Sequence, residues 1–279
     1  MKFYKYHGLG NDYIVIDPED AGDQISETFI RRICHRHYGV GSDGILLGPL
    51  KTDNGDVGLR IFNPDGSEAE KSGNGLRIFS SYLFDRGRVG NESFSIDTPG
   101  GLVASTVHEG GRIVTVEMGT VSFGSDDIPV RGPRRDVLNE TMNIGGEELV
   151  FCAATVGNPH CVILREKALA EEAKQWGPGI EVDPRFPNKT NVQFMEVMDR
   201  NNIKIEIWER GAGYTLASGS SSTASGAVAY KLGLCDKNIT VHMPGGEISL
   251  VIDDDFSITM TGPVAKIAEG ILADELFDI

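Results

Sequence analysis

The sequence predicts an α+β fold with two pseudo-symmetric duplicated domains, each a curled sheet around a central helix, and a ligand cleft between them. Two observations predict this fold. Short motifs occur twice at a nearly constant spacing, and each half of the chain holds one apolar helix-like run among many short strand-like runs. Such a mixture is typical of a sheet that packs on one apolar helix.

The repeated motifs indicate gene duplication. Gly10-Asn11 recurs as Gly157-Asn158, 147 positions later, and Ser72 recurs as Ser218, 146 positions later. Two units this long are domains rather than stacked repeats. Two further pairs have nearly the same spacing: residues 59–62 with 204–208, and 99–101 with 244–246. We therefore expect an N-terminal domain at 1–120, completed by the C-terminal strand within 263–279, and a second domain at 121–262.

Composition is that of an ordinary globular protein and excludes several partners. Of 279 residues, 40% are hydrophobic and 24% are charged, and the formal net charge is −15. So acidic a protein is a poor partner for nucleic acid or an anionic membrane. No run approaches the roughly 18 apolar residues that cross a membrane. The first residues lack the apolar segment of a secretory signal, so we expect a cytoplasmic location.

The four cysteines do not indicate a metal centre. They form no CxxC pair and lie too far apart for a zinc-ligand pattern. We expect all four to be buried packing residues. They are Cys34, Cys152, Cys161 and Cys235.

The first half begins with a pair of strands in residues 3–17, separated by a glycine-containing break. Ser26 is a typical N-cap, so we expect an amphipathic helix at 26–38. Residues 39–44 form a glycine-rich turn without the lysine and hydroxyl of a phosphate-binding loop. Asn, Pro, Asp and Gly at 63–66 predict a tight turn. The other expected strands are 45–47, 58–62, 93–97, 102–107 and 112–118.

The second half repeats this order after a crossing at 124–137 that is rich in proline, glycine, aspartate and arginine. Strands are expected within 150–165, followed by a charged helix at 166–175 and a strand at 190–192. The last expected strands are 203–208, 239–242 and 247–252.

One helix in each half begins in the same way. Ser72-Gly73-Asn74 and Ser218-Gly219-Ser220 each place a serine N-cap before small residues, and each run ends at a glycine, Gly87 or Gly233. Such a helix start presents free N–H groups and a positive dipole end, which suit a carboxylate or phosphate. Two of them could hold one small anion. A serine on each face of a carbon would then suit two-base proton exchange.

Other polar residues lie at turns and strand ends. Asn63, Asn191 and Arg210 could hold a distal carboxylate, while Glu209 and an amide hold an ammonium. These residues predict a small amino acid as the ligand. The remaining candidate amides are Asn11 and Asn158.

Taken together, these motifs resemble the diaminopimelate epimerase family. The resemblance covers nearly the full length and rests on residues 1–17, 62–70, 157–160, 190–192 and 208–213. It implies that the curled sheet of each domain is barrel-like, with the central helix inside it, and that the ligand α-carboxylate lies on the two helix N-termini. It also implies inversion at the α-carbon of a diamino dicarboxylic acid, LL- to meso-diaminopimelate in lysine biosynthesis, without pyridoxal phosphate or a metal. We leave a homodimer open.

The chain departs from the family pattern at the two base positions. The family has cysteine where this chain has Ser72 and Ser218. A thiol has a pKa of about 8.5, whereas a hydroxyl is a far weaker acid that normally needs an adjacent base. His160 and Glu209 are the bases that the motifs place nearby. Further departures are Gly44 for glutamine, Tyr214 for glutamate, and Ser220-Ser221-Ser222 for Thr-Gly-Ala.

Three hypotheses follow from these departures. The chain could be an epimerase assisted by His160, an isomerase of the same fold that moves a more acidic proton, or a non-catalytic amino-acid-binding protein. The retained candidates for the distal carboxylate favour the epimerase, which is our working hypothesis. An engineered pair of Cys→Ser changes is disfavoured, because residues beside both serines also depart from the pattern.

Overall fold

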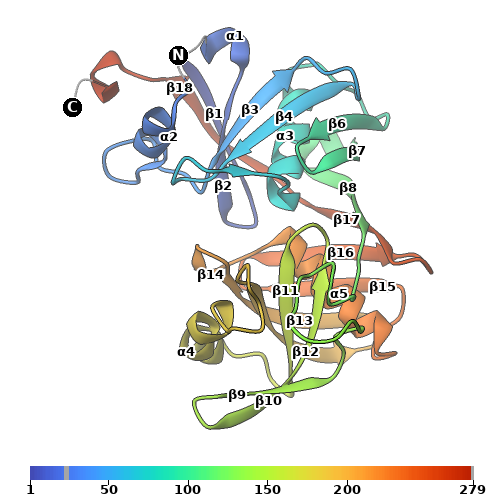
Figure 1. Cartoon of the computed structure of the whole chain (residues 1–279). Helices are drawn as coiled ribbons and strands as arrows, with labels where there is room; N and C mark the ends of the chain where they lie inside the picture. Colours follow the sequence, from blue (N-terminus) through green and yellow to red (C-terminus); the bar gives the residue numbers. More distant parts are fainter. Residues whose placement is uncertain (22–24, 278–279) are drawn as a thin grey trace. The chain divides into compact units, whose positions relative to one another are not determined.

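The computed structural model describes residues 1–21 and 25–277. The chain divides into two compact units (Figure 1). We call Met1–Val116 with Gly262–Ile279 the first unit, and Glu117–Thr261 the second unit.

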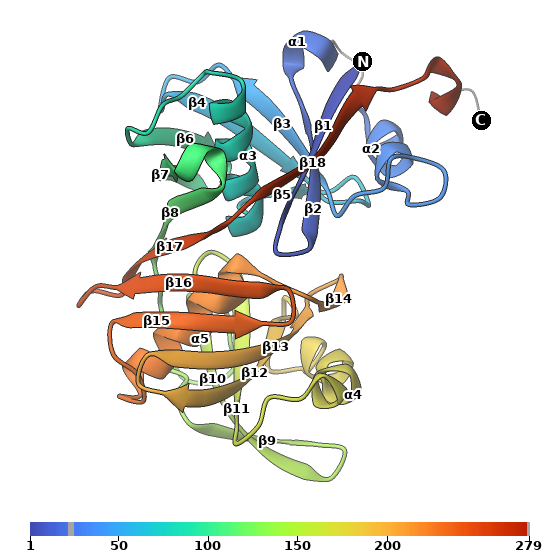
Figure 2. The ribbon, with the colours of Figure 1, turned by 180° about the vertical axis from the view of Figure 1, so that it is seen from behind.

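The sheet of the first unit includes the last strand of the chain. β18 (Ala265–Ile271) pairs antiparallel with β1 (Lys2–Gly8), so the two ends of the chain lie side by side, as the red and blue strands of Figures 1 and 2 show. The strand order is β18-β1-β2-β3-β4-β6-β7-β8, with parallel pairing only at β2–β3 and β4–β6. The other strands are β2 (Asn11–Ile16), β3 (Ile45–Leu50), β4 (Val57–Phe62), β5 (Glu68–Ala69), β6 (Phe94–Thr98), β7 (Gly101–His108) and β8 (Ile113–Thr120).

The second unit repeats this topology strand by strand. Its order is β9-β10-β11-β12-β13-β15-β16-β17, with parallel pairing only at β11–β12 and β13–β15. The chain therefore consists of two duplicated α+β domains, as expected. The strands are β9 (Glu140–Ile144), β10 (Glu147–Thr155), β11 (Pro159–Arg165), β12 (Asn191–Asp199), β13 (Asn202–Glu209), β14 (Gly213–Thr215), β15 (Asn238–Met243), β16 (Gly246–Ile252) and β17 (Ser257–Pro263).

One buried helix packs on the sheet of each unit (Figure 2). α3 (Gly73–Asp85) contacts β1, β2, β3 and β7, and α5 (Gly219–Lys231) contacts their counterparts β10, β11, β12 and β16. The expected sheet around a central helix is present in each unit, and in the part of the chain that the structure describes neither sheet closes on itself. Among the described residues no pairing joins β18 to β8, or β9 to β17, which are the first and last strands of the two orders.

The buried helix of the second unit contains several hydroxyl side chains. Ser222 donates to the carbonyl of Ser218 at 2.8 Å, and Thr223 donates to that of Gly219 at 2.9 Å. Bonding back to the preceding turn gives each of these hydroxyls a partner within the helix. A helix of small polar residues can therefore be buried in this position.

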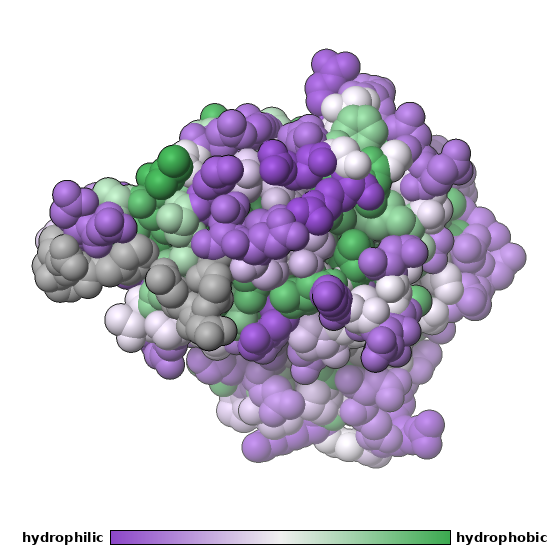
Figure 3. Space-filling view, turned by 90° about the horizontal axis from the view of Figure 1, so that it is seen from above, coloured by the Kyte–Doolittle hydropathy of each residue, from purple (hydrophilic) through white to green (hydrophobic). Residues whose placement is uncertain are grey.

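One face of the protein is mainly polar. Hydrophilic residues dominate the face seen in Figure 3, and hydrophobic patches lie apart from one another. In the two described ranges, no helix is both long and apolar enough to span a membrane.

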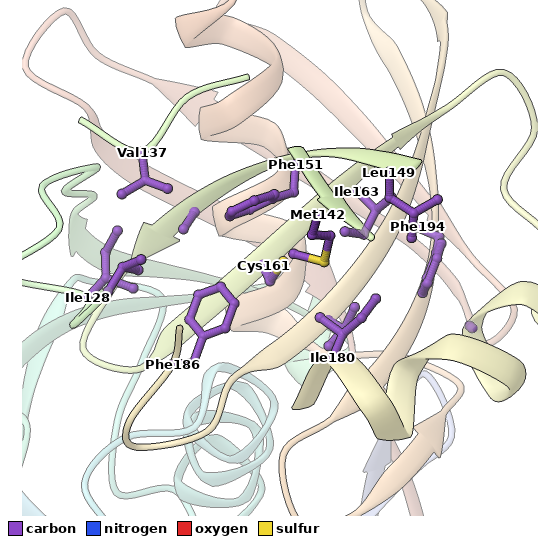
Figure 4. Close-up of a cluster of buried hydrophobic side chains, with 14 residues drawn as sticks. Ile128, Val137, Met142, Leu149, Phe151, Cys161, Ile163, Ile180, Phe186 and Phe194 are labelled. Atoms are coloured by element: carbon purple, nitrogen blue, oxygen red, sulfur yellow. The ribbon is translucent and has the colours of Figure 1, made fainter. Parts of the chain in front are cut away.

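A second helix covers the other face of each sheet. α2 (Glu27–Cys34) packs Phe29, Ile30 and Ile33 against β2 and β3, and α4 (Ala170–Glu181) belongs to the cluster in Figure 4. Cys161 and Val192 face this cluster. Because successive strand residues point to opposite faces, His160 and Asn191 point to the face that carries α5.

Two helix boundaries differ from the expected ones. Ser26 caps α2 as expected, but the helix ends at Cys34 because His35 is extended, with φ −67° and ψ 121°. The expected helix at 166–175 is instead α4 at 170–181. The helix starts later than expected because the side chain of Glu196, on β12, accepts from the Ala168 N–H at 3.1 Å. This bond holds Ala168 against β12 and outside the helix. The short helices are α1 (Pro18–Ala21), η2 (Glu109–Gly111) and η3 (Asp274–Phe277).

All four cysteines are buried and free, which confirms that expectation. Burial raises the pKa of Cys34 to about 12 and that of Cys161 well above its usual value. None of them offers an accessible thiolate.

Candidate functional site

Ser72 and Ser218 cap their helices with the same geometry. Ser72 has φ −141° and ψ 117°, and Ser218 has φ −149° and ψ 124°. The Oγ atom of Ser72 accepts from the Gly75 N–H at 3.0 Å, and that of Ser218 accepts from the Ser221 N–H at 3.4 Å. Both predicted N-caps are confirmed. Gly73 and Gly219 are the first helical residues, so no side chain at these positions covers the helix start.

In the first unit, the helix start is joined to β2 through two amides. The Nδ2 atom of Asn74 donates to Oδ1 of Asn11 at 3.0 Å, and Nδ2 of Asn11 donates to Oδ2 of Asp43 at 2.9 Å. The structure thus brings together Asn11, Ser72 and Asn74, which were predicted separately.

Arg77 lies beneath this helix start. It has no exposed surface, and its Nη2 donates to Oδ1 of Asn74 at 2.9 Å. Burial lowers the pKa of Arg77 to about 10, so the guanidinium is still charged at neutral pH. Its positive charge adds to that of the helix N-terminus. The sequence analysis missed this residue.

The second unit has the corresponding contact. Nδ2 of Asn158 donates to Oγ of Ser220 at 3.5 Å, and Oδ1 of Asn158 lies 2.9 Å from Nε2 of His160. Asn158 and Ser220 occupy the positions that Asn11 and Asn74 hold in the first unit. The structure therefore places three predicted residues of this unit in one polar group.

His160 is fully buried, which sets its protonation. Burial lowers its pKa to about 3; the amide of Gln193 opposes this shift, and the charge of Arg210 adds to it. His160 is thus neutral at neutral pH and can accept or donate a hydrogen bond. Such a weak base cannot readily store a proton. Gln193, which the sequence analysis missed, donates to Oγ of Ser221 at 3.0 Å.

Asn191 holds the turn that carries Arg210. Its Nδ2 donates to the carbonyl of Pro159 at 2.9 Å, and its Oδ1 accepts from the Arg210 N–H at 3.0 Å. The exposed Arg210 also donates through Nη1 to the carbonyl of Asn188 at 3.2 Å. Both ends of the Asn191 amide therefore contact backbone groups.

Glu181, at the end of α4, anchors the same turn. Its carboxylate accepts from Trp208 Nε1 at 2.8 Å and from the Gly211 N–H at 3.0 Å. Glu209 lies between these two anchored residues, half-buried at the end of β13. The sequence analysis missed Glu181 because the charged helix was expected to end at 175, before this residue.

Asn63 lies in the expected tight turn of the first unit. Its Nδ2 donates to Oγ of Ser67 at 3.0 Å, and its carbonyl accepts from the Gly66 N–H at 2.9 Å. Asn63 belongs to the first unit, whereas Asn191 and Arg210 belong to the second.

Tyr13 is the main residue that the sequence analysis missed. Its hydroxyl lies 3.2 Å from Oγ of Ser72. The spacing of 147 that relates Asn158 to Asn11 also relates His160 to Tyr13. That offset was therefore the signal that could have found it.

Comparison with known proteins gives a consistent result. The sequence profile described as "Diaminopimelate epimerase" matches residues 3–124 and 152–267. A protein named "Diaminopimelate epimerase 2" from Nostoc sp. is 60% identical over 279 residues, covering 100% of this chain and 98% of that protein. A "Diaminopimelate epimerase" from Desulfitobacterium hafniense is 37% identical over 283 residues, covering 99% of each chain.

A solved structure shares the fold at low sequence identity. A probable proline racemase from Agrobacterium radiobacter aligns with a TM-score of 0.73 at 15% identity, covering 99% of this chain and 94% of that chain. At this identity the likeness concerns the fold alone.

Proposed function

The chain belongs to the diaminopimelate epimerase family, and from this premise we propose that it interconverts LL- and meso-diaminopimelate by moving a proton at one α-carbon. In this proposal each domain contributes one serine and one helix N-terminus.

The duplicated helix start is the observation that carries the proposal. In both units a serine caps the helix, a glycine follows, and the third residue contacts an asparagine at the start of a strand. The free N–H groups of such helix starts favour a carboxylate. With a carboxylate held at such a helix start, the serine that caps the helix would lie beside the α-carbon of the ligand. The remaining role, binding of the distal carboxylate, falls to Asn63, Asn191 and Arg210.

Serine chemistry at the base positions is the unusual part of the proposal. The buried cysteines cannot serve, because burial raises the pKa of Cys34 and of Cys161. A serine hydroxyl exchanges a proton only when a neighbouring group accepts or supplies one. We therefore propose that Ser72 and Ser218 pass protons with the help of adjacent groups. The sequence indicates His160 and Glu209 for this role; the neutral His160 would pass a proton along its hydrogen bonds rather than hold it.

The experiment follows the α-proton in D2O. Purified protein is incubated with LL-diaminopimelate, loss of the α-proton signal is recorded by NMR, and the stereoisomers are separated by chiral chromatography. We expect deuterium incorporation together with formation of the meso isomer. The matched control is the Ser72→Ala plus Ser218→Ala variant, which keeps both helices and lacks both hydroxyls.

The other hypotheses correspond to other outcomes. Saturable binding of diaminopimelate in calorimetry without exchange would contradict the epimerase and favour a binding protein. Exchange without inversion would point to a base on one face only. Neither result is expected if both serines act.

A further inference from the structure

The hydroxyls of Tyr13 and Ser72 form a pair inside the first unit. The two oxygens lie 3.2 Å apart, and either can be the donor. The Oγ atom of Ser72 also accepts from the Gly75 N–H at 3.0 Å. The N-cap bond therefore fixes where Oγ lies, and Tyr13 supplies a second group that can exchange its proton.

The absence of a side chain at Gly44 makes room for the Tyr13 ring. A Cβ atom at Gly44 would lie 2.7 Å from Cε1 of Tyr13 and 2.5 Å from the carbonyl oxygen of Phe62. Neither distance is tolerable for a carbon contact. Gly44 is held beside this ring because the Ile14 N–H donates to its carbonyl at 3.1 Å. The glycine and the tyrosine therefore fit each other.

The second unit differs at the same two positions. The spacing of 147 relates Tyr13 to His160 and Gly44 to Asn191, and the strand register agrees, because Ile14 pairs with Ile45 as Cys161 pairs with Val192. The Nε2 atom of His160 contacts Asn158, whereas the Tyr13 hydroxyl contacts the helix-capping serine. The two units thus place different acid–base groups at equivalent positions.

A phenol suits the role that an aliphatic alcohol performs poorly. A tyrosine hydroxyl has a reference pKa of about 10, so its anion is far more accessible than a serine alkoxide. It is also a better proton donor in the reverse direction. A serine hydroxyl is commonly activated by a neighbouring group that takes its proton, and the anion of a more acidic neighbour can do this.

We propose that Tyr13 is the proton partner of Ser72 in the epimerisation. This inference rests on the proposed function. As the C–H bond at the α-carbon breaks, its proton joins Oγ of Ser72 and the electron pair stays on the substrate. The original Ser72 proton moves at the same time to the phenolate oxygen of Tyr13. Reprotonation from this face runs the same two transfers backwards, and exchange with solvent water returns Tyr13 to its starting state.

The first test is Tyr13→Phe, which keeps the ring and removes the hydroxyl. We expect α-proton exchange to fall by about a hundredfold or more, the usual contribution of a general acid–base group, while calorimetric binding of diaminopimelate is unchanged. Tyr6→Phe is the matched control. Tyr6 pairs with Tyr13 across β1 and β2, but its hydroxyl donates to Asp85 at 2.7 Å, so exchange should persist.

Two further measurements distinguish a proton-transfer role of Tyr13 from a purely structural one: the pH dependence of exchange, and the rescue of exchange by a second substitution. The wild-type exchange rate should rise toward alkaline pH as the phenolate forms, and Tyr13→Phe should lack this rise. Adding Ser72→Cys to Tyr13→Phe should restore exchange to the level of Ser72→Cys alone, because a thiolate needs no phenolate. The proposal would be overturned if Tyr13→Phe lost activity but kept the alkaline rise in rate, or if adding Ser72→Cys did not restore exchange.

The remaining outcomes separate this inference from the proposed function. If the wild type exchanges and Tyr13→Phe exchanges equally well, the role of Tyr13 is refuted and the epimerase stands. If the wild type shows no exchange at any pH, both are refuted.

Discussion

The side-chain amide of Asn74 donates to Oδ1 of Asn11 across 3.0 Å and joins the first turn of α3 to the first residue of β2. Asn74 is only 3% exposed, and its own oxygen accepts from the buried Arg77. One amide therefore links a strand, a helix start and a buried cation.

Asn74→Ala should lower the free energy of unfolding by about 1–3 kcal/mol, because it removes one partner from the buried Arg77 and one from the partly buried Asn11. Urea unfolding of the variant and the wild type measures this difference. Ser220→Ala is the matched control at the equivalent position of the second unit, where the contact to Asn158 is 3.5 Å long. Equal losses for both variants would contradict the linking role of Asn74.

The combined change Ser72→Cys plus Ser218→Cys should raise epimerase activity on diaminopimelate. The two helix N-termini would lower the pKa of both thiols and make the thiolate accessible. Serine and cysteine are close in volume, so the fold should tolerate the pair at the cost of a modest repacking. Either single change should give exchange from one face with far less inversion. If the folded double variant binds diaminopimelate but shows no inversion, the site is built for another reaction.

Arg210→Ala should weaken binding of diaminopimelate by about 2 kcal/mol while leaving alanine binding nearly unchanged, because only the first ligand has a distal carboxylate. Calorimetry with both amino acids makes the comparison. Lys189→Ala is a suitable control, since Nζ of Lys189 lies 3.7 Å from the carboxylate of Glu181, which anchors the turn of Arg210. A similar loss for both ligands would disprove a distal clamp.

His160 should make the protein less stable as the pH falls below neutrality. Burial lowers its pKa to about 3, so between this value and about 6.5 the unfolded chain binds a proton that the folded chain does not. Stability therefore rises with pH in this window, by on the order of 2 kcal/mol between pH 5 and pH 7.

His160→Gln should remove this part of the pH dependence, as measured by urea unfolding at the two pH values. His108→Gln is the control, because His108 is exposed. A pH slope that is unchanged in His160→Gln would show that the imidazole is not held neutral in the folded protein.

Several parts of the fold could be predicted because their signals are local. The serine caps at Ser72 and Ser218 and the stop glycines Gly87 and Gly233, with φ of 65° and 71°, depend on a few neighbouring residues. The turn at 63–66 is equally local. Helix boundaries that depend on a distant partner were missed, as when Glu196 delays the start of α4.

The sequence by itself determined the duplication, the family and the two helix starts, because repeated spacing and capping residues can be recognised from the order of the residues alone. Only the tertiary structure decided which side chains meet at those helix starts. Tyr13 and Ser72 are 59 positions apart, and Asn11 and Asn74 are 63 apart. Their contacts arise because β2 packs against α3, and such packing depends on the whole sheet rather than on any local pattern.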